Sequence, residues 1–326
     1  MNPIVLSCHT PTFAVRGHFT IARGSVAEVR VLEVQARCGT LVGRGESSPE
    51  RSGVAVAQAA AEVAAFTARH PFFTREDLLG LMPRGPVRNA IDLALWNLEA
   101  QRRGQPVWQL AGLPEPGGVK SAFTISVDQP ERMEAAAREA SARPLLKIKL
   151  TGAGDLERVA AVRRGAPQAR LIVDANGAWT PGYYLRMAEP LARLGVELLE
   201  QPLPPGRDAE LAGLARPVPV YADESCRDRH DLAALVGLYD GVNLKLDKCG
   251  GLTEALELKA EARRLGFAVM VGCMLSSSLA VAPALLLAQD ADVVDLDAPL
   301  LLAEDRNPSL MEKDGLLMPA EARLWG

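Results

Sequence analysis

The 326-residue sequence lacks several features that mark particular classes of protein. Its 36 basic residues do not outnumber its 40 acidic residues, and the net charge of −4 gives no reason to expect binding to nucleic acid or to an anionic membrane. The N-terminal segment MNPIVLSCHTPTF has no basic flank followed by an apolar core, so we expect no signal peptide.

Paired cysteines are lacking as well. The five cysteines are scattered, odd in number and without a CxxC motif: Cys8, Cys38, Cys226, Cys249 and Cys273. This pattern is typical of reduced thiols, and it predicts a cytoplasmic protein rather than a disulfide-linked secreted one.

One stretch, residues 267–288, carries no charge and is roughly long enough to cross a bilayer. It is interrupted by Gly272, by the serines at 276–278 and by Pro283. We therefore predict a buried strand, a turn and a buried helix here, and no membrane span.

A repeating pattern occupies the second half of the chain. From residue 119 onward, eight short apolar or β-branched runs each end in polar residues and precede a helix-like segment. From the second run on, the polar ends recur at intervals of 22 to 28 residues: Lys149, Asp174, Glu200, Asp223, Lys245, Cys273 and Asp295. Helices are expected, for example, over 155–164, 182–194 and 253–265. Eight alternating strands and helices predict a parallel barrel of the TIM type; an open doubly wound sheet is the alternative, since the period alone does not prove closure.

The first 115 residues have a different pattern. Strands are expected over 26–34 and 40–45, and helices over 54–68 and 87–103. Strands followed by helices predict a separate α+β lobe. The Pro- and Gly-rich segment 112–118 divides this lobe, residues 1–115, from a barrel over 119–300.

Three consecutive runs of the barrel end in a carboxylate: Asp174 in IVDAN, Glu200 in LLEQP and Asp223 in YADES. Catalytic groups of such barrels lie at the C-terminal ends of strands about 4.8 Å apart, so these side chains can converge. Bare carboxylates would repel one another, and a hard divalent cation removes that repulsion. Although a single acidic residue is usually a helix cap or a surface charge, three at equivalent positions predict a Mg²⁺ site.

Lysines end the flanking strands and bracket the three carboxylates. Lys147 and Lys149 share one face of the second run, and Lys245 ends the sixth. A lysine alone usually extends to solvent, but a nearby cation and a second lysine lower its pKa, so that it can act as a base. We expect Lys147 to do this for Lys149, and Asp247 to hold Lys245 in position.

This arrangement predicts proton transfer next to a carboxylate. A substrate carboxylate bound to Mg²⁺ has an acidified α-proton, because the metal stabilises the ene-diolate formed when that proton leaves. With one lysine on each side, one removes the proton and the other returns it on the opposite face. The expected reaction is racemisation or epimerisation.

The strings that carry these residues resemble the muconate-lactonizing subgroup of the enolase superfamily. In the family's order they are GRGESSP, RNAIDLALWNLEAQ, LLKIKL, IVDANGAW, LLEQPL, ADES and NLKLDKCGG. The resemblance implies a modified (β/α)7β barrel with an N-terminal α+β capping domain, which the C-terminal tail 301–326 helps to complete. It also implies Asp174, Glu200 and Asp223 as ligands of one Mg²⁺ per subunit, with Lys149 and Lys245 as the acid/base pair.

Two strand ends narrow the reaction within the superfamily. The dehydratase and mandelate racemase branches have a histidine at the seventh strand, where this chain has Gly272-Cys273-Met274. The eighth run ends in Asp295 and Asp297, which share one face and suit a cationic ligand group; a solvated loop or a helix cap is the alternative. Because dipeptide epimerases bind the substrate's α-ammonium group with such a pair, the resemblance implies a dipeptide epimerase.

The remaining expectations concern the substrate. Arg23 lies in IARGS, on a loop that family members fold over the substrate, where a guanidinium suits a distal carboxylate. This is compatible with L-Ala-D/L-Glu from peptidoglycan recycling. Lys147, Thr124 and Cys273 are expected to line the pocket. The enzymatic alternative is an N-acylamino acid racemase, an o-succinylbenzoate synthase or a cycloisomerase. The non-enzymatic alternative is a metal-stabilised binding protein. The sequence is compatible with a homo-oligomer but does not predict the number of subunits.

Overall fold

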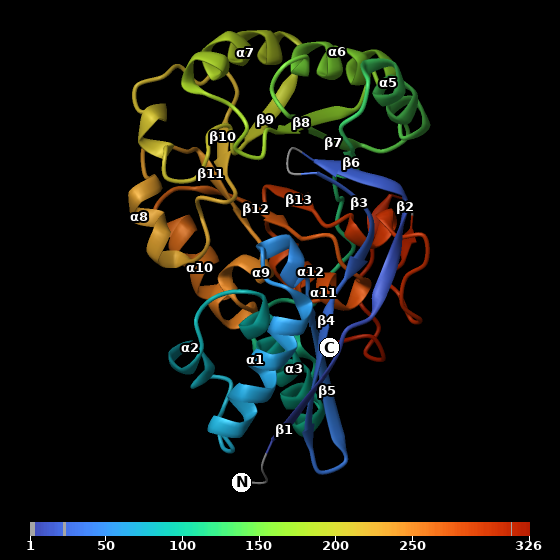
Figure 1. The fold of residues 1–326 in the computed structure, drawn as a ribbon, viewed down its shortest axis with the longest axis vertical. Helices are drawn as coiled ribbons and strands as arrows, with labels where there is room; N and C mark the ends of the chain where they lie inside the picture. The colour runs from blue at the N-terminus through green and yellow to red at the C-terminus, as the bar shows by residue number, and fades with distance from the viewer. Residues whose placement is uncertain (1–3, 22–23, 314) are drawn as a thin grey trace.

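The computed structural model describes residues 4–21, 24–313 and 315–326, and its largest feature is a barrel of eight parallel strands (Figure 1). The strands are β6 (Phe123–Ile125), β7 (Leu145–Lys149), β8 (Arg170–Asp174), β9 (Val196–Glu200), β10 (Val220–Ala222), β11 (Gly241–Leu244), β12 (Ala268–Gly272) and β13 (Val293–Asp295). Ala122 N–H donates to the Val294 carbonyl at 2.8 Å, which brings the two edge strands together and nearly closes the sheet. The predicted barrel is confirmed, and the open sheet is wrong.

The helices of the barrel differ in length, from single turns of four residues to helices of thirteen. They are α5 (Pro130–Glu139), α6 (Asp155–Gly165), α7 (Pro181–Arg193), α8 (Leu232–Leu235), α9 (Leu246–Cys249), α10 (Leu252–Arg264), α11 (Ser278–Val281) and α12 (Ala284–Ala288), with 3-10 turns η2 (Asp208–Leu211), η3 (Arg229–Asp231) and η4 (Ala298–Leu301). Helix α7 shows why a helix begins where it does: the Thr180 side chain accepts a hydrogen bond from Tyr183 N–H, and Pro181 occupies the first turn. All three barrel helices predicted by range are confirmed.

The uncharged stretch 267–288 folds as predicted, into strand β12 and the short buried helices α11 and α12, with Pro283 between the two helices. In the part of the chain that the structure describes, no helix is long and apolar enough to cross a bilayer.

Side chains that point into the barrel alternate along each strand and form layers. The lower layer is apolar and consists of Ala122, Leu145, Ile172, Leu198, Tyr221 and Met270. Two residues further along four of these strands lie Lys147, Asp174, Glu200 and Asp223, all buried. The apolar layer therefore closes the barrel beneath a layer of charged groups at the C-terminal ends of the strands.

The N-terminal lobe is an antiparallel sheet covered by helices. Its elements are β1 (Val5–His9), β4 (Leu32–Cys38), β5 (Leu41–Ser47), η1 (Pro49–Ser52), α1 (Val56–Arg69), α2 (Leu78–Leu81), α3 (Pro86–Arg103) and α4 (Val107–Leu110), with a separate hairpin of β2 (Thr12–Ile21) and β3 (Gly24–Arg30). The single strand predicted over 26–34 is wrong, because the chain leaves one sheet and enters another at Val31, whose N–H donates to the Pro11 carbonyl. The continuous apolar sequence concealed that change of partner.

Both lobes are joined through the hairpin and the C-terminal tail, which contains β14 (Glu312–Lys313) and β15 (Leu316–Leu317). Val127 N–H, just beyond β6, donates to the Thr20 carbonyl of the hairpin at 3.1 Å. Near the C-terminus, the Trp325 Nε1–H donates to the Leu93 carbonyl of α3 at 3.1 Å. These contacts hold the N-terminal lobe against the barrel (Figure 1).

Candidate active site

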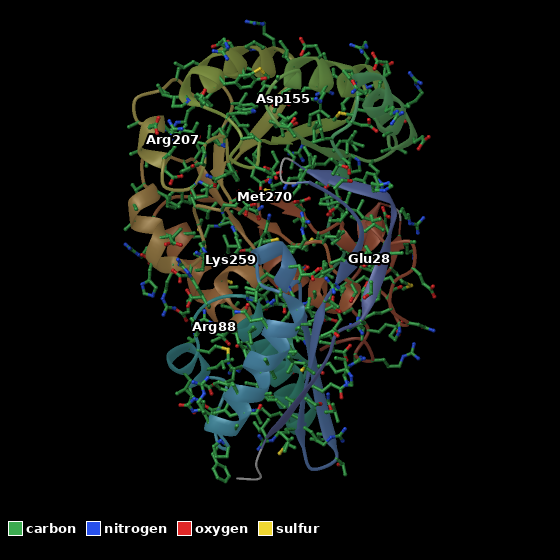
Figure 2. All side chains as sticks on the ribbon, in the orientation of Figure 1. Glu28, Arg88, Asp155, Arg207, Lys259 and Met270 are labelled. Atoms are coloured by element: carbon green, nitrogen blue, oxygen red, sulfur yellow. The ribbon has the colours of Figure 1, made fainter. Side chains whose placement is uncertain are left out.

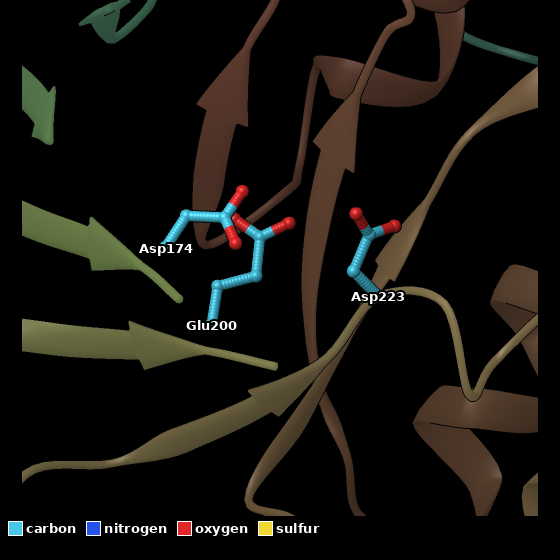
Figure 3. Close-up of side chains that lie close together, drawn as sticks. All are labelled: Asp174, Glu200 and Asp223. Carbon is cyan, nitrogen blue, oxygen red and sulfur yellow. The ribbon is translucent and has the colours of Figure 1, made fainter. Parts of the chain in front are cut away.

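Three carboxylates converge at the C-terminal ends of neighbouring strands (Figure 3). Asp174 ends β8, Glu200 ends β9 in register with it, and Asp223 follows β10 directly. One ligand oxygen from each lies within 4.8 Å of the others, and all three residues are buried. Carboxylate oxygens are the ligands that Mg²⁺ prefers, so this oxygen-only set fits a hard divalent cation.

The three carboxylates differ in their affinity for protons. Burial, reinforced by the charge of Asp174, raises the pKa of Glu200 to about 7. Burial also opposes ionisation of Asp174, but Lys149 lowers the pKa of Asp174 to about 2. In the same way Lys245 overcomes burial and holds the pKa of Asp223 well below its usual value. Glu200 is therefore the member of the triad at which a cation competes most directly with a proton.

Lysines reach the triad from both ends. The Nζ atom of Lys149 lies 2.7 Å from Asp174 Oδ2, and the two residues are paired in register between β7 and β8. At the other end, Lys245 Nζ lies 2.6 Å from Asp223 Oδ2. A group held by the triad would therefore have an amine on either side, which is the arrangement that the sequence predicts.

Lys147 lies beneath these two lysines and is fully buried. Its Nζ atom lies 2.6 Å from Glu200 Oε2 and 2.7 Å from Asp295 Oδ2. Burial favours a lower pKa, but Asp295 and Glu200 raise the pKa of Lys147 well above its usual value, and Asp223 likewise raises that of Lys245. For Lys245 this direction is opposite to the predicted lowering, which requires a cation to offset the carboxylate charges.

Asp247 does not have the place that the sequence suggested. Residues 246–249 form helix α9 rather than a strand, so Asp247 and Lys245 do not share a strand face. The Oδ1 atom of Asp247 accepts a hydrogen bond from Ser48 N–H at 2.8 Å, in the loop after β5. Asp247 therefore connects the barrel to the N-terminal lobe, and Lys245 is paired with Asp223 instead.

The eighth strand places two acidic side chains beside this cluster. Asp295 ends β13 and pairs with Lys147, while Asp297 Oδ2 accepts a hydrogen bond from Thr124 N–H at 2.6 Å. Both are buried, so the alternative of a solvated loop is wrong. Burial, reinforced by Asp295, raises the pKa of Asp297 to about 6. Within the described residues, Asp295 Oδ1 has no hydrogen-bond partner, so the pair retains the capacity to bind a cationic group.

The remaining predicted pocket residues have different outcomes. Thr124 is buried on β6 and touches the acidic pair through its backbone. The Cys273 thiol donates to the Asp295 carbonyl at 3.4 Å, and burial raises its pKa. Arg23 lies outside the described residues. Among the described residues no cysteine forms a disulfide.

Three residues near the triad were not predicted. Asn243, two residues before Lys245 and on the same face of β11, donates to Glu200 Oε1 at 2.7 Å. Lys248, one turn after Lys245, pairs with Asp223 Oδ1 at 2.7 Å. Gly272 leaves room for Asn243 and Lys245, because a Cβ there would lie 2.7 Å from Asn243 Oδ1 and 3.1 Å from Lys245 Cε. Alternation along the strand points to Asn243, whereas the roles of Lys248 and Gly272 depend on contacts between distant segments.

Known proteins share this architecture. Residues 131–312 match the family model described as enolase C-terminal domain-like, and residues 5–112 match the N-terminal domain of mandelate racemase / muconate lactonizing enzyme. The L-Ala-D/L-Glu epimerase of Escherichia coli K12 is 43% identical over 314 residues, which is 95% of each chain. An N-acetyl-D-glutamate racemase from Pseudoalteromonas is 42% identical over 258 residues, covering 78% of this chain and 82% of the racemase.

A solved structure is similar over the whole chain. It is a crystal structure of an enolase family member from Agrobacterium tumefaciens, with homology to dipeptide epimerases and with bound sodium and L-Ala-L-Glu. It matches at a TM-score of 0.96 and 46% identity, covering 99% of this chain and 100% of the other. Its fold and that of the present chain are therefore the same.

Proposed function

Because the chain belongs to the mandelate racemase/muconate lactonizing enzyme family of the enolase superfamily, we propose that it is a dipeptide epimerase acting on L-Ala-D/L-Glu. The relatives are epimerases and racemases, and the chain is an isomerase. The observation that carries the proposal is the pairing of two lysines with opposite ends of one buried carboxylate triad, Lys149 with Asp174 and Lys245 with Asp223.

Asp174, Glu200 and Asp223 would hold one Mg²⁺. When bound, the cation stabilises the negative charge that develops on the substrate carboxylate as the α-proton leaves. It also offsets the carboxylate charges that now raise the pKa of Lys245, so that a lysine can lose its proton and act as a base. Lys149 and Lys245 then handle the proton on opposite faces of the α-carbon, and Lys147 neutralises the charge beneath them.

Asp295 and Asp297 would bind the α-ammonium group at the other end of the dipeptide. Support for this role comes from their burial and from the Asp295 oxygen that lacks a hydrogen-bond partner among the described residues. Thr124 and Cys273 would line this subsite, since both contact the acidic pair. Arg23 would bind the distal carboxylate of the glutamate residue.

The second candidate is racemisation of an N-acylamino acid, which has no ammonium group. The 42% identity with an N-acetyl-D-glutamate racemase favours it. Substituting Asp297→Asn discriminates between the two, because it leaves the Lys147–Asp295 ion pair in place. If the variant loses turnover of the dipeptide but keeps that of N-acetylglutamate, the dipeptide is the substrate that the acidic pair binds. If the variant turns over both compounds as the wild type does, the result supports a substrate without an amine.

The direct test is proton NMR of L-Ala-L-Glu in D₂O with Mg²⁺. The proposal expects the glutamate α-proton to be replaced by deuterium while L-Ala-D-Glu accumulates. No exchange at that position, at saturating Mg²⁺ and substrate, rejects dipeptide epimerisation. A positive result would fit a role in recycling peptidoglycan peptides in the cytoplasm. In this proposal the barrel over residues 119–300 is the catalytic domain, and residues 1–115 and 301–326 form the domain that caps it.

A further inference from the structure

Helix α9 carries one of the two lysines and is too short to be stable alone. Lys245 is its N-terminal capping residue, and the helix itself is the single turn Leu246–Cys249. The last carbonyls of a helix have no partner within it, and an isolated turn does not offset the cost of its own nucleation. The position of Lys245 beyond β11 therefore depends on groups that bind α9 from outside.

Arg88, on helix α3 of the N-terminal lobe, is such a group. It is 6% exposed and lies at the junction of the two lobes (Figure 2). Its Nε donates to the Gly250 carbonyl at 3.0 Å, its Nη2 donates to the Cys249 carbonyl, and its Nη1 donates to the Met82 carbonyl at 3.2 Å. A planar guanidinium can serve two adjacent carbonyls together, and its charge is favourable at a helix C-terminus.

The glycines after α9 fit around this contact. A Cβ on Gly250 would lie 2.5 Å from Arg88 Nε, and one on Gly251 would collide with the carboxylate of Asp92, also on α3. Both glycines have positive φ, 86° and 120°. The segment is therefore shaped to let α3 approach the end of α9 closely.

We propose that Arg88 is a positioning residue for Lys245, so that the N-terminal lobe controls proton transfer on one face of the substrate only. Lys149 has no such dependence, because it is the last residue of β7 and is paired with Asp174 in the strand ladder. The proposal rests on the two-lysine function proposed above and assigns the capping lobe a part in it.

A misplaced Lys245 changes the ratio of α-proton exchange to inversion in D₂O. Lys149 removes the α-proton from one epimer: the C–H bond breaks, its electron pair passes into the substrate carboxylate system, and the proton joins Lys149 Nζ. That amine exchanges with solvent. If Lys245 cannot deliver a proton to the opposite face, Lys149 returns a deuteron to the original face. Exchange with retention then rises relative to inversion, and only for this epimer.

The experiment compares both epimers, L-Ala-L-Glu and L-Ala-D-Glu, by NMR at saturating Mg²⁺. Lys245→Ala first identifies the epimer whose α-proton Lys149 still exchanges. Arg88→Gln and the charge-retaining Arg88→Lys are expected to slow epimerisation about tenfold, the size of a lost charge-assisted hydrogen bond. Both should raise the ratio of exchange to inversion at least about threefold for that same epimer and not for the other.

Arg44→Gln is the matched control, because Arg44 also donates to two backbone carbonyls of a distant segment, those of Arg323 and Leu324 in the C-terminal tail. It should lower the melting temperature without changing the ratio. An unchanged ratio in the folded Arg88 variants, or a rise for the epimer that Lys149→Ala identifies, overturns the inference. If the wild type exchanges neither epimer, the proposed function itself fails, which is a separate result. Arg88→Lys keeps the charge and most of the stem, so the test stands if Arg88→Gln does not fold.

Discussion

The two lysines that flank the carboxylate triad are supported in different ways. Lys149 is the last residue of a barrel strand that is paired on both sides, with β6 and with β8. Lys245 lies just past its strand, at the start of a single helical turn. Residues of the N-terminal lobe contact that turn, among them Ser48 through Asp247 and Arg88 through the last carbonyls.

This difference shows how one site can contain a lysine held by the barrel strands, Lys149, and a lysine whose position depends on the other lobe, Lys245. The position of Lys149 is fixed by the hydrogen bonds of β7 to both neighbouring strands. The position of Lys245 instead follows the packing of the N-terminal lobe, which also supplies the hairpin of β2 and β3. Changes in that lobe should therefore affect one face of the substrate more than the other.

The largest effect is expected from removing either lysine. Lys149→Ala and Lys245→Ala should each reduce epimerisation at least about a thousandfold, because a proton must be handled on both faces. Each variant should still exchange the α-proton of one epimer, and the two variants should retain opposite epimers. If both variants exchanged the same epimer, measured by NMR in D₂O, the lysines would not lie on opposite faces.

Removing a triad carboxylate should affect both faces equally. Asp174→Asn is expected to weaken Mg²⁺ binding at least about a hundredfold by isothermal titration calorimetry, because a charged ligand becomes neutral. Asp240→Asn is the control, since Asp240 accepts a hydrogen bond from Val220 N–H at the opposite end of β10. Equal Mg²⁺ affinities in the two variants would contradict the assignment of Asp174.

Mg²⁺ binding should depend on pH through Glu200. Its pKa is raised to about 7, so below that pH the group carries a proton that the cation must displace. The Mg²⁺ affinity should be nearly constant above pH 8 and fall by up to about tenfold per unit below pH 7. The same raised pKa means that the metal-free protein binds more protons than the unfolded chain between about pH 4.5 and 7, which lowers stability as the pH rises through that range. A flat Mg²⁺ affinity between pH 6 and 8 would contradict this role of Glu200.

The smallest effect on activity is expected from substituting Asp247, which lies in α9 next to Lys245. Asp247→Asn keeps an acceptor for Ser48 N–H and removes a charge whose burial raises the pKa of Asp247 to about 6. Activity should change less than about threefold. Asp247→Leu leaves the Ser48 N–H unsatisfied and should cost about 1–3 kcal/mol of stability by chemical denaturation. Equal stabilities of the two variants would show that this contact does not support α9.

The sequence predicts most of what the barrel positions. Strand endings at a regular interval were enough to bring Asp174, Glu200 and Asp223 together, because parallel strands align their C-terminal ends. The change of sheet at Val31 and the hydrogen bonds of Asp247 and Arg88 could not be predicted in this way. They depend on contacts between residues far apart in the chain, such as Ser48 with Asp247, for which no local periodicity exists.

A crystal structure with Mg²⁺ and L-Ala-L-Glu tests the account most directly. The account predicts one cation bound by Asp174, Glu200 and Asp223, the substrate carboxylate on that cation, and the two amines of Lys149 and Lys245 facing the glutamate α-carbon from opposite sides. A complex in which both amines lie on the same side of that carbon, or in which the cation binds elsewhere, would contradict it.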